Sequence, residues 1–278
     1  MKRKKRKGSL LNVIGDSIVY IYGLILTLPL FFAIITAFKS EQERIKNPIG
    51  LPESFSFNNF VDAWVDGNML NAAKNSIIIT VGTVILQLVF VIIVSYALNC
   101  IRDTKIGVAL YMLVLCGLFI PGTGGVTKLM MRREMGLYNN LWGEIFVGAF
   151  SITMGVFLVS GFLRTLPGDL EEAARIDGAS DTQICFRIIT PVIKPSLATI
   201  AILTFTSAWN SALGPMLTLR DKSLHTIPMV LLLNYSTEYS MKYTTLFAGV
   251  IMTSIPVIIF YCINQKHFVS ALAGSVKG

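Results

Sequence analysis

Six long stretches of this chain contain no charged residue. They lie between Asp16 and Lys39 and over residues 75–101, 106–127, 145–163, 195–219 and 243–265. A helix needs roughly 20 apolar residues to cross the hydrocarbon of a bilayer, because each residue adds only about 1.5 Å. None of the stretches alternates with the period of two that strands of a membrane barrel show. The pattern therefore predicts an all-α integral membrane protein with six transmembrane helices.

Composition and charge support this prediction. Hydrophobic residues make up 53% of the 278 and charged residues 14%, whereas a soluble domain carries about 25% charged residues. The six stretches hold no ionisable side chain, although carriers driven by ions usually have one at membrane depth. Their Ser, Thr, Asn and Gln side chains suit a path for an uncharged polyol, but such residues also simply join neighbouring helices.

The basic segment 1–16 precedes the first apolar stretch, which is too long for a cleaved signal peptide. Its run of six basic residues is interpreted as a positive-inside signal that contacts anionic lipid, with no nucleic acid involved. The predicted divisions are a cytoplasmic segment 1–16, a six-helix transmembrane domain 17–265 and a cytoplasmic tail 266–278. Both termini are expected inside, and the wide spacing of Cys and His predicts no metal site.

The longest predicted internal loop is 164–195, and its first half indicates a short helix. Asp169 is a good N-cap, and Glu172 completes a capping box three residues later. A helix over Leu170–Asp177 is expected to end at Gly178, the residue type favoured where the chain turns left-handed. Its apolar, small-residue surface suits either a groove on a partner protein or the membrane surface.

A second short helix follows in the same loop. Ser180 is the expected cap, with Gln183 at the matching third position, and Pro191 is expected to stop the helix.

The run from Glu172 to Ala179, followed by Phe186–Pro191 and Pro195, resembles the EAA loop of binding-protein-dependent ABC importers. Thr190 stands where that pattern has Leu. The segments 161–180, 201–210 and 267–278 extend the similarity to the carbohydrate-uptake branch, which includes the smaller permease of the maltose importer.

This resemblance implies a type I ABC importer permease fold, in which the first loop helix docks on a cytoplasmic ATPase. The implied partners are a second homologous permease, two ABC ATPase subunits and an extracellular or periplasmic solute-binding protein, all at a bacterial cell membrane. ATP and Mg would bind to the ATPase subunits, and this chain would carry no cofactor and have no catalytic residue of its own. The implied ATPase-coupling residues are Glu171, Glu172, Ala173, Ala174, Asp177, Gly178, Ala179 and Pro191.

The chain has no phosphate-binding loop of its own. The glycine-rich run 121–125 lacks the lysine that such a loop requires. ATP hydrolysis is therefore expected from another chain.

Candidate cargo contacts lie in the fifth apolar stretch and in the loop after it. Trp209 offers an indole face to a sugar ring, and Asn210 and Ser207 offer hydrogen bonds. The family often has an acidic residue where this chain has Ser211. By resemblance, an outer loop reaches the solute-binding protein through Asn234, Tyr235, Ser236, Thr237, Glu238 and Tyr239; an ordinary loop on the outer rim is the alternative.

Other readings stay open from sequence. The same importer architecture could carry glycerol phosphate, a polyol or an anionic oligosaccharide, because Lys128, Arg132 and Arg133 in an outer loop could attract an anion or dock a partner. An ion channel or carrier and a membrane-embedded enzyme are disfavoured by the uncharged stretches.

Overall fold

The computed structural model describes residues 10–119, 125–166, 169–235 and 242–275, and every regular element in these ranges is a helix. The all-α prediction is confirmed. In chain order the elements are α1 (Leu10–Ala37), α2 (Glu41–Lys46), α3 (Asn58–Asp66), α4 (Met69–Cys100), α5 (Lys105–Cys116), α6 (Gly125–Glu134), α7 (Leu141–Ala149), α8 (Thr153–Leu163), α9 (Asp169–Ile176), α10 (Asp181–Gln183), the π-helix η1 (Ile184–Ile189), α11 (Thr190–Val192), α12 (Lys194–Trp209), α13 (Leu213–Thr218), the 3₁₀-helix η2 (Lys222–Leu224), α14 (Ile227–Tyr235) and α15 (Tyr243–Ser275).

Four helical segments in the described ranges are long and apolar enough to cross a membrane. They are Gly15–Ala37, Met69–Cys100, Leu141–Leu163 and Tyr243–Ile263. A fifth span forms if Asp181–Val192 and Lys194–Trp209 are counted together, although these two parts meet at an angle of 79°. Each of these segments overlaps a predicted apolar stretch.

The predicted sixth crossing is only partly accounted for. In the stretch 106–127 the structure has helix α5, whose 12 residues extend about 18 Å, well short of the roughly 30 Å of hydrocarbon. Residues 120–124 lie outside the described part of the chain. The count of six therefore stays a prediction.

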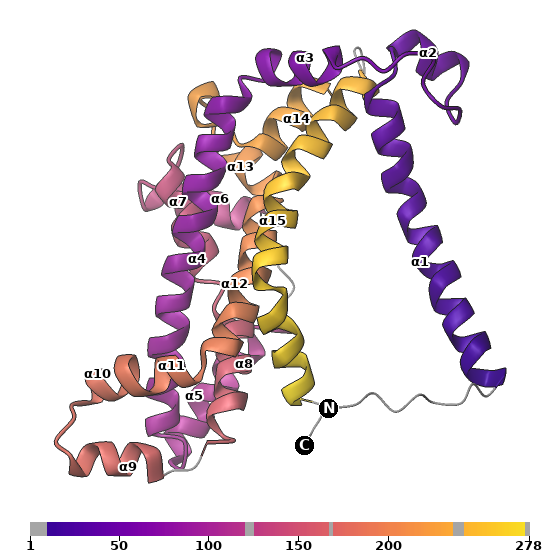
Figure 1. Cartoon of the computed structure of the whole chain (residues 1–278). Helices are drawn as coiled ribbons and strands as arrows, with labels where there is room; N and C mark the ends of the chain where they lie inside the picture. Colours follow the sequence, from indigo (N-terminus) through magenta and orange to yellow (C-terminus); the bar gives the residue numbers. More distant parts are fainter. Residues whose placement is uncertain (1–9, 120–124, 167–168, 236–241, 276–278) are drawn as a thin grey trace. The chain divides into compact units, whose positions relative to one another are not determined.

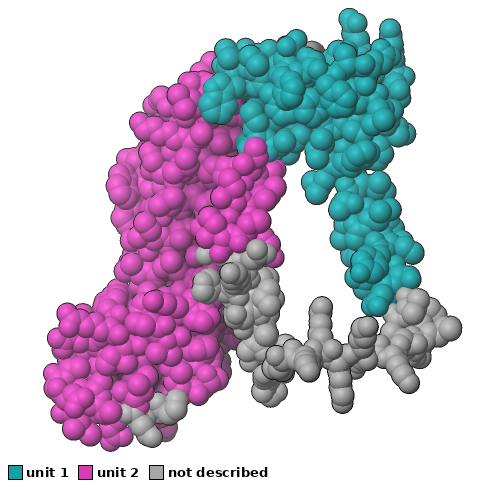
Figure 2. All heavy atoms as spheres, viewed as in Figure 1, with its two compact units in different colours: residues 1–67, 233–253 teal, residues 68–232, 254–278 magenta. Residues whose placement is uncertain are grey.

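The chain divides into two compact units, shown in Figure 2. Unit 1 comprises residues 1–67 and 233–253. Within it, the fully buried Lys39 donates from Nζ to the Asn47 carbonyl at 2.7 Å, and Asn59 donates to the carbonyls of Ala37 and Lys39. Glu41 accepts hydrogen bonds from the backbone and hydroxyl of Thr244. Polar contacts thus tie the two sequence segments of unit 1 together.

Unit 2 comprises residues 68–232 and 254–278, and helix α4 is its centre. This helix packs along α7, α8 and α12 (Figure 1). Glycines on the neighbouring helices allow the close approach. A Cβ at Gly155 would lie 2.5 Å from Val91, and one at Gly148 would lie 2.8 Å from Thr83. Small residues at such crossings let membrane helices pack closely, so these glycines bring α7 and α8 against α4.

Gln87, near the middle of α4, joins three elements of unit 2. The apolar stretch 145–163 is broken between α7 and α8, and the Gln87 side-chain amide donates to the carbonyl of Ser151 at this break, at 2.6 Å. The Gln87 carbonyl oxygen accepts from the Thr204 hydroxyl of α12, also at 2.6 Å. Because lipid offers no hydrogen bonds, the break requires polar partners of this kind.

We predict that Gln87→Leu lowers the free energy of unfolding by about 1–2 kcal/mol, because two hydrogen bonds between membrane helices are lost. Thermal unfolding of the purified protein in detergent measures the change. Ile85→Leu, on an exposed face of the same helix, is the matched control and should leave the midpoint unchanged. Equal midpoints for Gln87→Leu and the parent would contradict the bridging role.

Candidate functional site

The loop 164–195 forms one end of unit 2, where α9 and the α10–α11 segment lie (Figure 1). Gly178 has a φ of +81°, in the left-handed region that favours glycine. The amide of Ala179 donates to the carbonyl of Ala174, and that of Gly178 donates to Arg175, both at 3.0 Å. This pair of bonds is a Schellman motif, so the predicted end of the first loop helix is confirmed. Helix α9 begins at Asp169, whose side chain lies outside the described set.

The predicted cap of the second loop helix is also confirmed. The Ser180 hydroxyl accepts from the Gln183 amide, and the Gln183 side chain accepts from the Ser180 amide at 2.9 Å. The predicted stop at Pro191 is confirmed to within two residues, since the segment Asp181–Val192 ends there and the next helix turns away by 79°. The chain continues through the π-helix η1 and α11, and bends only at Ile193. Pro191 lies in the last turn of this segment, two residues before the bend.

Helix α9 has an inner side that packs on its own chain. Ala174 is buried in a core cluster with residues of α4, α8, η1 and α12, and Ala179 packs against the same cluster. The carboxylate of Glu171 accepts from the Asn99 side chain at 2.8 Å. Glu171 and Ala174, two of the expected coupling residues, therefore hold the loop to unit 2.

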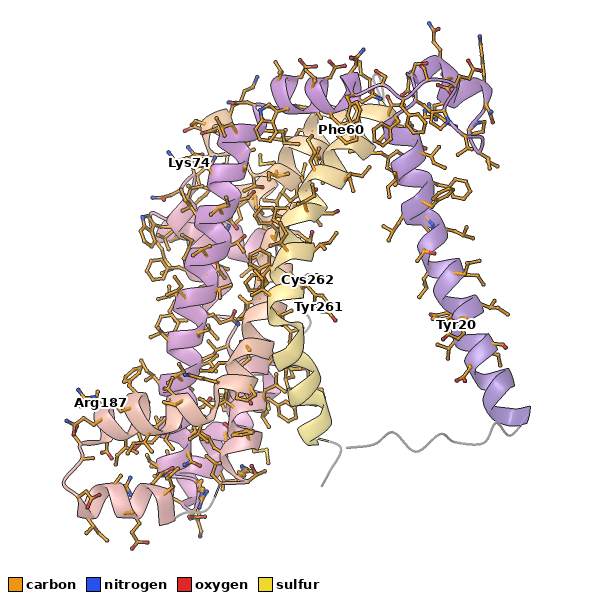
Figure 3. All side chains as sticks on the ribbon, viewed as in Figure 1. Tyr20, Phe60, Lys74, Arg187, Tyr261 and Cys262 are labelled. Atoms are coloured by element: carbon orange, nitrogen blue, oxygen red, sulfur yellow. The ribbon has the colours of Figure 1, made fainter. Side chains whose placement is uncertain are left out.

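The outer side of α9 is free within the described chain. Glu172, Ala173, Asp177 and Gly178 are exposed, and Ile176 has 81% of its surface exposed. Figure 3 shows Arg187 of η1 at this same end of unit 2. Lys74 lies near the start of α4, at the other end of that helix. This side of α9 is therefore open to contact with another protein.

A polar cavity lies inside unit 2, between α4, α7, α8, α12 and α13. It has a volume of about 420 Å³, within the range of small-ligand pockets. Its lining includes Ser207, one of the predicted cargo residues. The other polar side chains around it are Ser76, Thr83, Gln87, Arg132, Glu144, Ser151, Thr204, Ser211 and Thr226.

A buried ion pair forms part of this lining. Both terminal nitrogens of the Arg132 guanidinium, on α6, donate to the carboxylate of Glu144, on α7. The Thr218 hydroxyl donates to the same carboxylate. The two charged side chains are only 7% and 8% exposed. The prediction that Arg132 attracts an anion from an outer loop is therefore corrected, because its charge is already paired. Arg133 stacks on Tyr138 at 4.9 Å instead.

One candidate membrane span has a charged residue near its start, directly before the apolar stretch 145–163. The apolar span that contains α7 begins at Leu141, so it includes Glu144. Sequence reasoning gave no role to Glu144, which directly precedes the apolar stretch 145–163. The signal in the sequence was Asn140, whose side chain caps α7, followed four positions later by the acidic Glu144.

Trp209 does not line the cavity. It is buried, and its ring stacks on Phe205 at 5.7 Å, while Phe205 also stacks on Phe260 at 4.0 Å. Asn210 is exposed and its amide donates to the Thr206 carbonyl. The structure thus separates Ser207, which faces the cavity, from Trp209.

The predicted outer-loop contacts are described only at their start. Asn234 is exposed near the end of α14. The side chain of Tyr235 and all of Ser236, Thr237, Glu238 and Tyr239 lie outside the described residues.

Comparisons of the sequence with known proteins agree on one protein family. The family described as "Binding-protein-dependent transport system inner membrane component" matches residues 76–272, well over half of the chain. A diacetylchitobiose uptake system permease protein of Streptomyces coelicolor is 31% identical over 268 residues, covering 95% of this chain and 87% of that protein. A melibiose/raffinose/stachyose import permease protein of Bacillus subtilis is 32% identical, covering 90% of this chain and 91% of that protein.

Solved structures share the fold. A chain of a bacterial ABC transporter involved in the import of the acidic polysaccharide alginate gives a TM-score of 0.81 at 24% identity, covering 96% of this chain and 100% of that one. A chain of the MetNI methionine ABC transporter gives 0.57 at 17% identity, covering 73% and 95%. At these identities the likeness concerns the fold alone.

We predict that Glu144→Leu destabilises the protein by about 3–5 kcal/mol, because it leaves the Arg132 guanidinium buried without a counter-charge. The double variant Arg132→Met with Glu144→Leu should recover most of this loss, since an apolar pair of similar volume needs no partner. Thermal unfolding of the single and double variants measures both effects. A double variant as unstable as the single one would show that the unpaired charge of Arg132 does not cause the loss of stability.

Proposed function

Because the chain belongs to the family of binding-protein-dependent transport system inner membrane components, we propose that it is the membrane subunit of an ATP-driven importer for a sugar or oligosaccharide. It forms part of the path across the membrane and does not hydrolyse ATP itself. The observation that carries the proposal is the family match, which includes the whole loop 164–195.

The loop is the proposed joint with a separate ATPase. The outer side of α9, with Ala173, Ile176 and Asp177, would sit in a groove of the nucleotide-binding subunit, where an apolar side chain on a short helix anchors well. Glu171 and Ala174 would keep that helix fixed to unit 2. ATP binding could then shift the spanning helices as rigid bodies, to the extent that the docked states differ in free energy.

Two kinds of observation favour a sugar as cargo. Relatives at 31–32% identity are named for uptake of diacetylchitobiose and of melibiose, raffinose and stachyose. Most of the polar side chains that line the cavity of unit 2 carry hydroxyl or amide groups, which match the hydroxyls of a neutral sugar. An anionic cargo has less support, since Arg132 is neutralised by Glu144.

The remaining parts of the assembly follow from the same family. A second permease would complete the path, two ATPase subunits would hold ATP and Mg, and a solute-binding protein would deliver cargo outside. Both termini are proposed to be cytoplasmic, with the basic segment 1–16 resting on anionic lipid.

Co-expression of the tagged chain with its genomic neighbours tests the assembly. An ATPase and a second permease should co-purify, and a strain lacking the chain should lose ATP-dependent uptake of at least one member of a panel of neutral and acidic oligosaccharides. A chain that purifies alone, in a strain whose uptake is unchanged, would refute the importer.

We predict that Ile176→Asp reduces co-purified ATPase at least tenfold, because it places a charge at the centre of the proposed docking side. Ile45→Asp replaces an exposed isoleucine of α2 in unit 1 by the same residue and serves as the matched control. Quantitative immunoblotting of the purified complexes measures both. Full retention of the ATPase by Ile176→Asp would place the joint elsewhere.

A further inference from the structure

Two arginines meet at a shallow depression where α4, α5 and α8 come together, at the end of unit 2 that carries the loop 164–195 (Figure 1). Arg102 lies in the turn after α4, and Arg164 caps the end of α8. Among the described residues that line the depression, these two are charged and none is acidic. Two cations at one place, with no acid between them, attract an anion.

Both arginines lie directly at the ends of membrane spans. The span Met69–Cys100 ends two residues before Arg102, and the span Leu141–Leu163 ends one residue before Arg164. Lys105, the exposed first residue of α5, adds a positive charge three residues after Arg102. Basic residues at the end of a span lie at the depth of the lipid headgroups, so the nearest anions there are lipid phosphates.

The arginine side chains keep donors for such a phosphate. The Arg164 guanidinium stacks over the ring of Tyr111 at 4.7 Å, and stacking uses its flat face while its N–H donors lie at the edge. The contacts of Arg102 are long, at 3.5 Å to the Asn99 side chain and 3.6 Å to the carboxylate of Asp103. The Asp103 side chain is 92% exposed, so this ion pair is weak and leaves the charge of Arg102 largely uncompensated.

The size of the depression limits what can enter it. A Cβ at Gly107, in its wall, would lie 1.9 Å from the carbonyl oxygen of Ile101, so glycine lets the first turn of α5 approach the end of α4. The depression holds about 20 Å³, which is room for one water molecule or one phosphate oxygen. A larger ligand must therefore lie across the surface and insert only a small part of itself.

The surface of α5 beside the depression is apolar. Ile106, Leu110 and Leu113 follow each other at helical spacing along this helix, and all three are exposed within the described chain. A phosphate ion would use only the two guanidiniums, whereas a phospholipid would also cover this apolar stripe with its acyl chains. The combination of a cationic depression and an apolar stripe therefore favours a lipid.

We propose that Arg102, Lys105 and Arg164 bind the headgroup of an anionic phospholipid whose acyl chains lie along α5. The proposal goes beyond the proposed function, because it concerns neither the cargo nor the ATPase. The bound lipid would join the ends of α4 and α8. It would also lie next to the base of the loop, since Asn99, which contacts Arg102, bonds Glu171 of α9 as well.

Native mass spectrometry of the purified chain, with any subunit that co-purifies, tests the site. The probes are phosphatidylglycerol and phosphatidylcholine with the same acyl chains, and the parent should bind phosphatidylglycerol at least about tenfold more tightly. Arg102→Gln and Arg164→Gln should each weaken that binding about 5-fold, and the double variant about 25-fold, because each basic residue near an anionic lipid contributes about this factor.

Arg187→Gln is the matched control. It removes an exposed arginine from η1 at the same end of unit 2, outside the depression, and should bind phosphatidylglycerol like the parent (Figure 3). The variant Arg102→Lys with Arg164→Lys keeps both charges and should stay within about threefold of the parent. It separates a loss of charge from a loss of folding, which the unfolding midpoint of each variant in lipid-free detergent also reports.

Three outcomes would overturn the proposal. The first is equal binding of the two lipids to the parent, and the second is an equal loss of binding in Arg187→Gln. The third is displacement of phosphatidylglycerol by millimolar inorganic phosphate, which would assign the depression to a free phosphate ion. Each of them leaves co-purification of the ATPase and sugar uptake unaffected, so a failure of the lipid site is distinct from a failure of the proposed function.

Discussion

The hydrogen bonds of Gln87 hold the centre of unit 2 together. In a hydrocarbon environment a broken helix must find partners for its backbone inside the protein. The break between α7 and α8 meets this requirement through the carbonyl of Ser151, and the same Gln87 amide group reaches Thr204 on α12. One side chain therefore fixes three apolar segments in register. The break that it stabilises lies next to the polar cavity, so the cavity depends on the same contacts.

The Arg132–Glu144 pair raises the question of why a membrane protein buries two charges. Such a pair contributes little net stability compared with apolar residues of the same size, because both ions lose their water. It does fix direction, since both terminal nitrogens of the guanidinium are bonded to the same carboxylate. Together with the Thr218 hydroxyl, the pair joins α6, α7 and α13 through one carboxylate.

Local signals predicted local structure well. The left-handed turn at Gly178 and the reciprocal cap of Ser180 and Gln183 depend on residues within a few positions of each other, so their pattern is visible in the sequence. The apolar stretches likewise predicted most of the spans. Pro191 marked the end of the second loop helix to within two residues, because its ring disfavours continuation of the helix. The pairing of Arg132 with Glu144 was missed because nothing in the sequence says which side chains meet within the fold.

Helix α12 connects the two candidate sites. Helix α12 begins directly after the 79° bend at Ile193. Most of the loop 164–195 comes before that bend. The loop is stiff, because a Schellman motif, a capping box and the burial of Ala174 fix its geometry. Further along α12, the hydroxyl of Thr204 donates a hydrogen bond to Gln87, and Ser207 lines the cavity. A displacement of the loop that moved α12 as a rigid body would therefore alter the cavity wall and the Gln87 bridge together. Under the proposed function, this is the physical route by which a partner bound to the loop changes the space available to cargo.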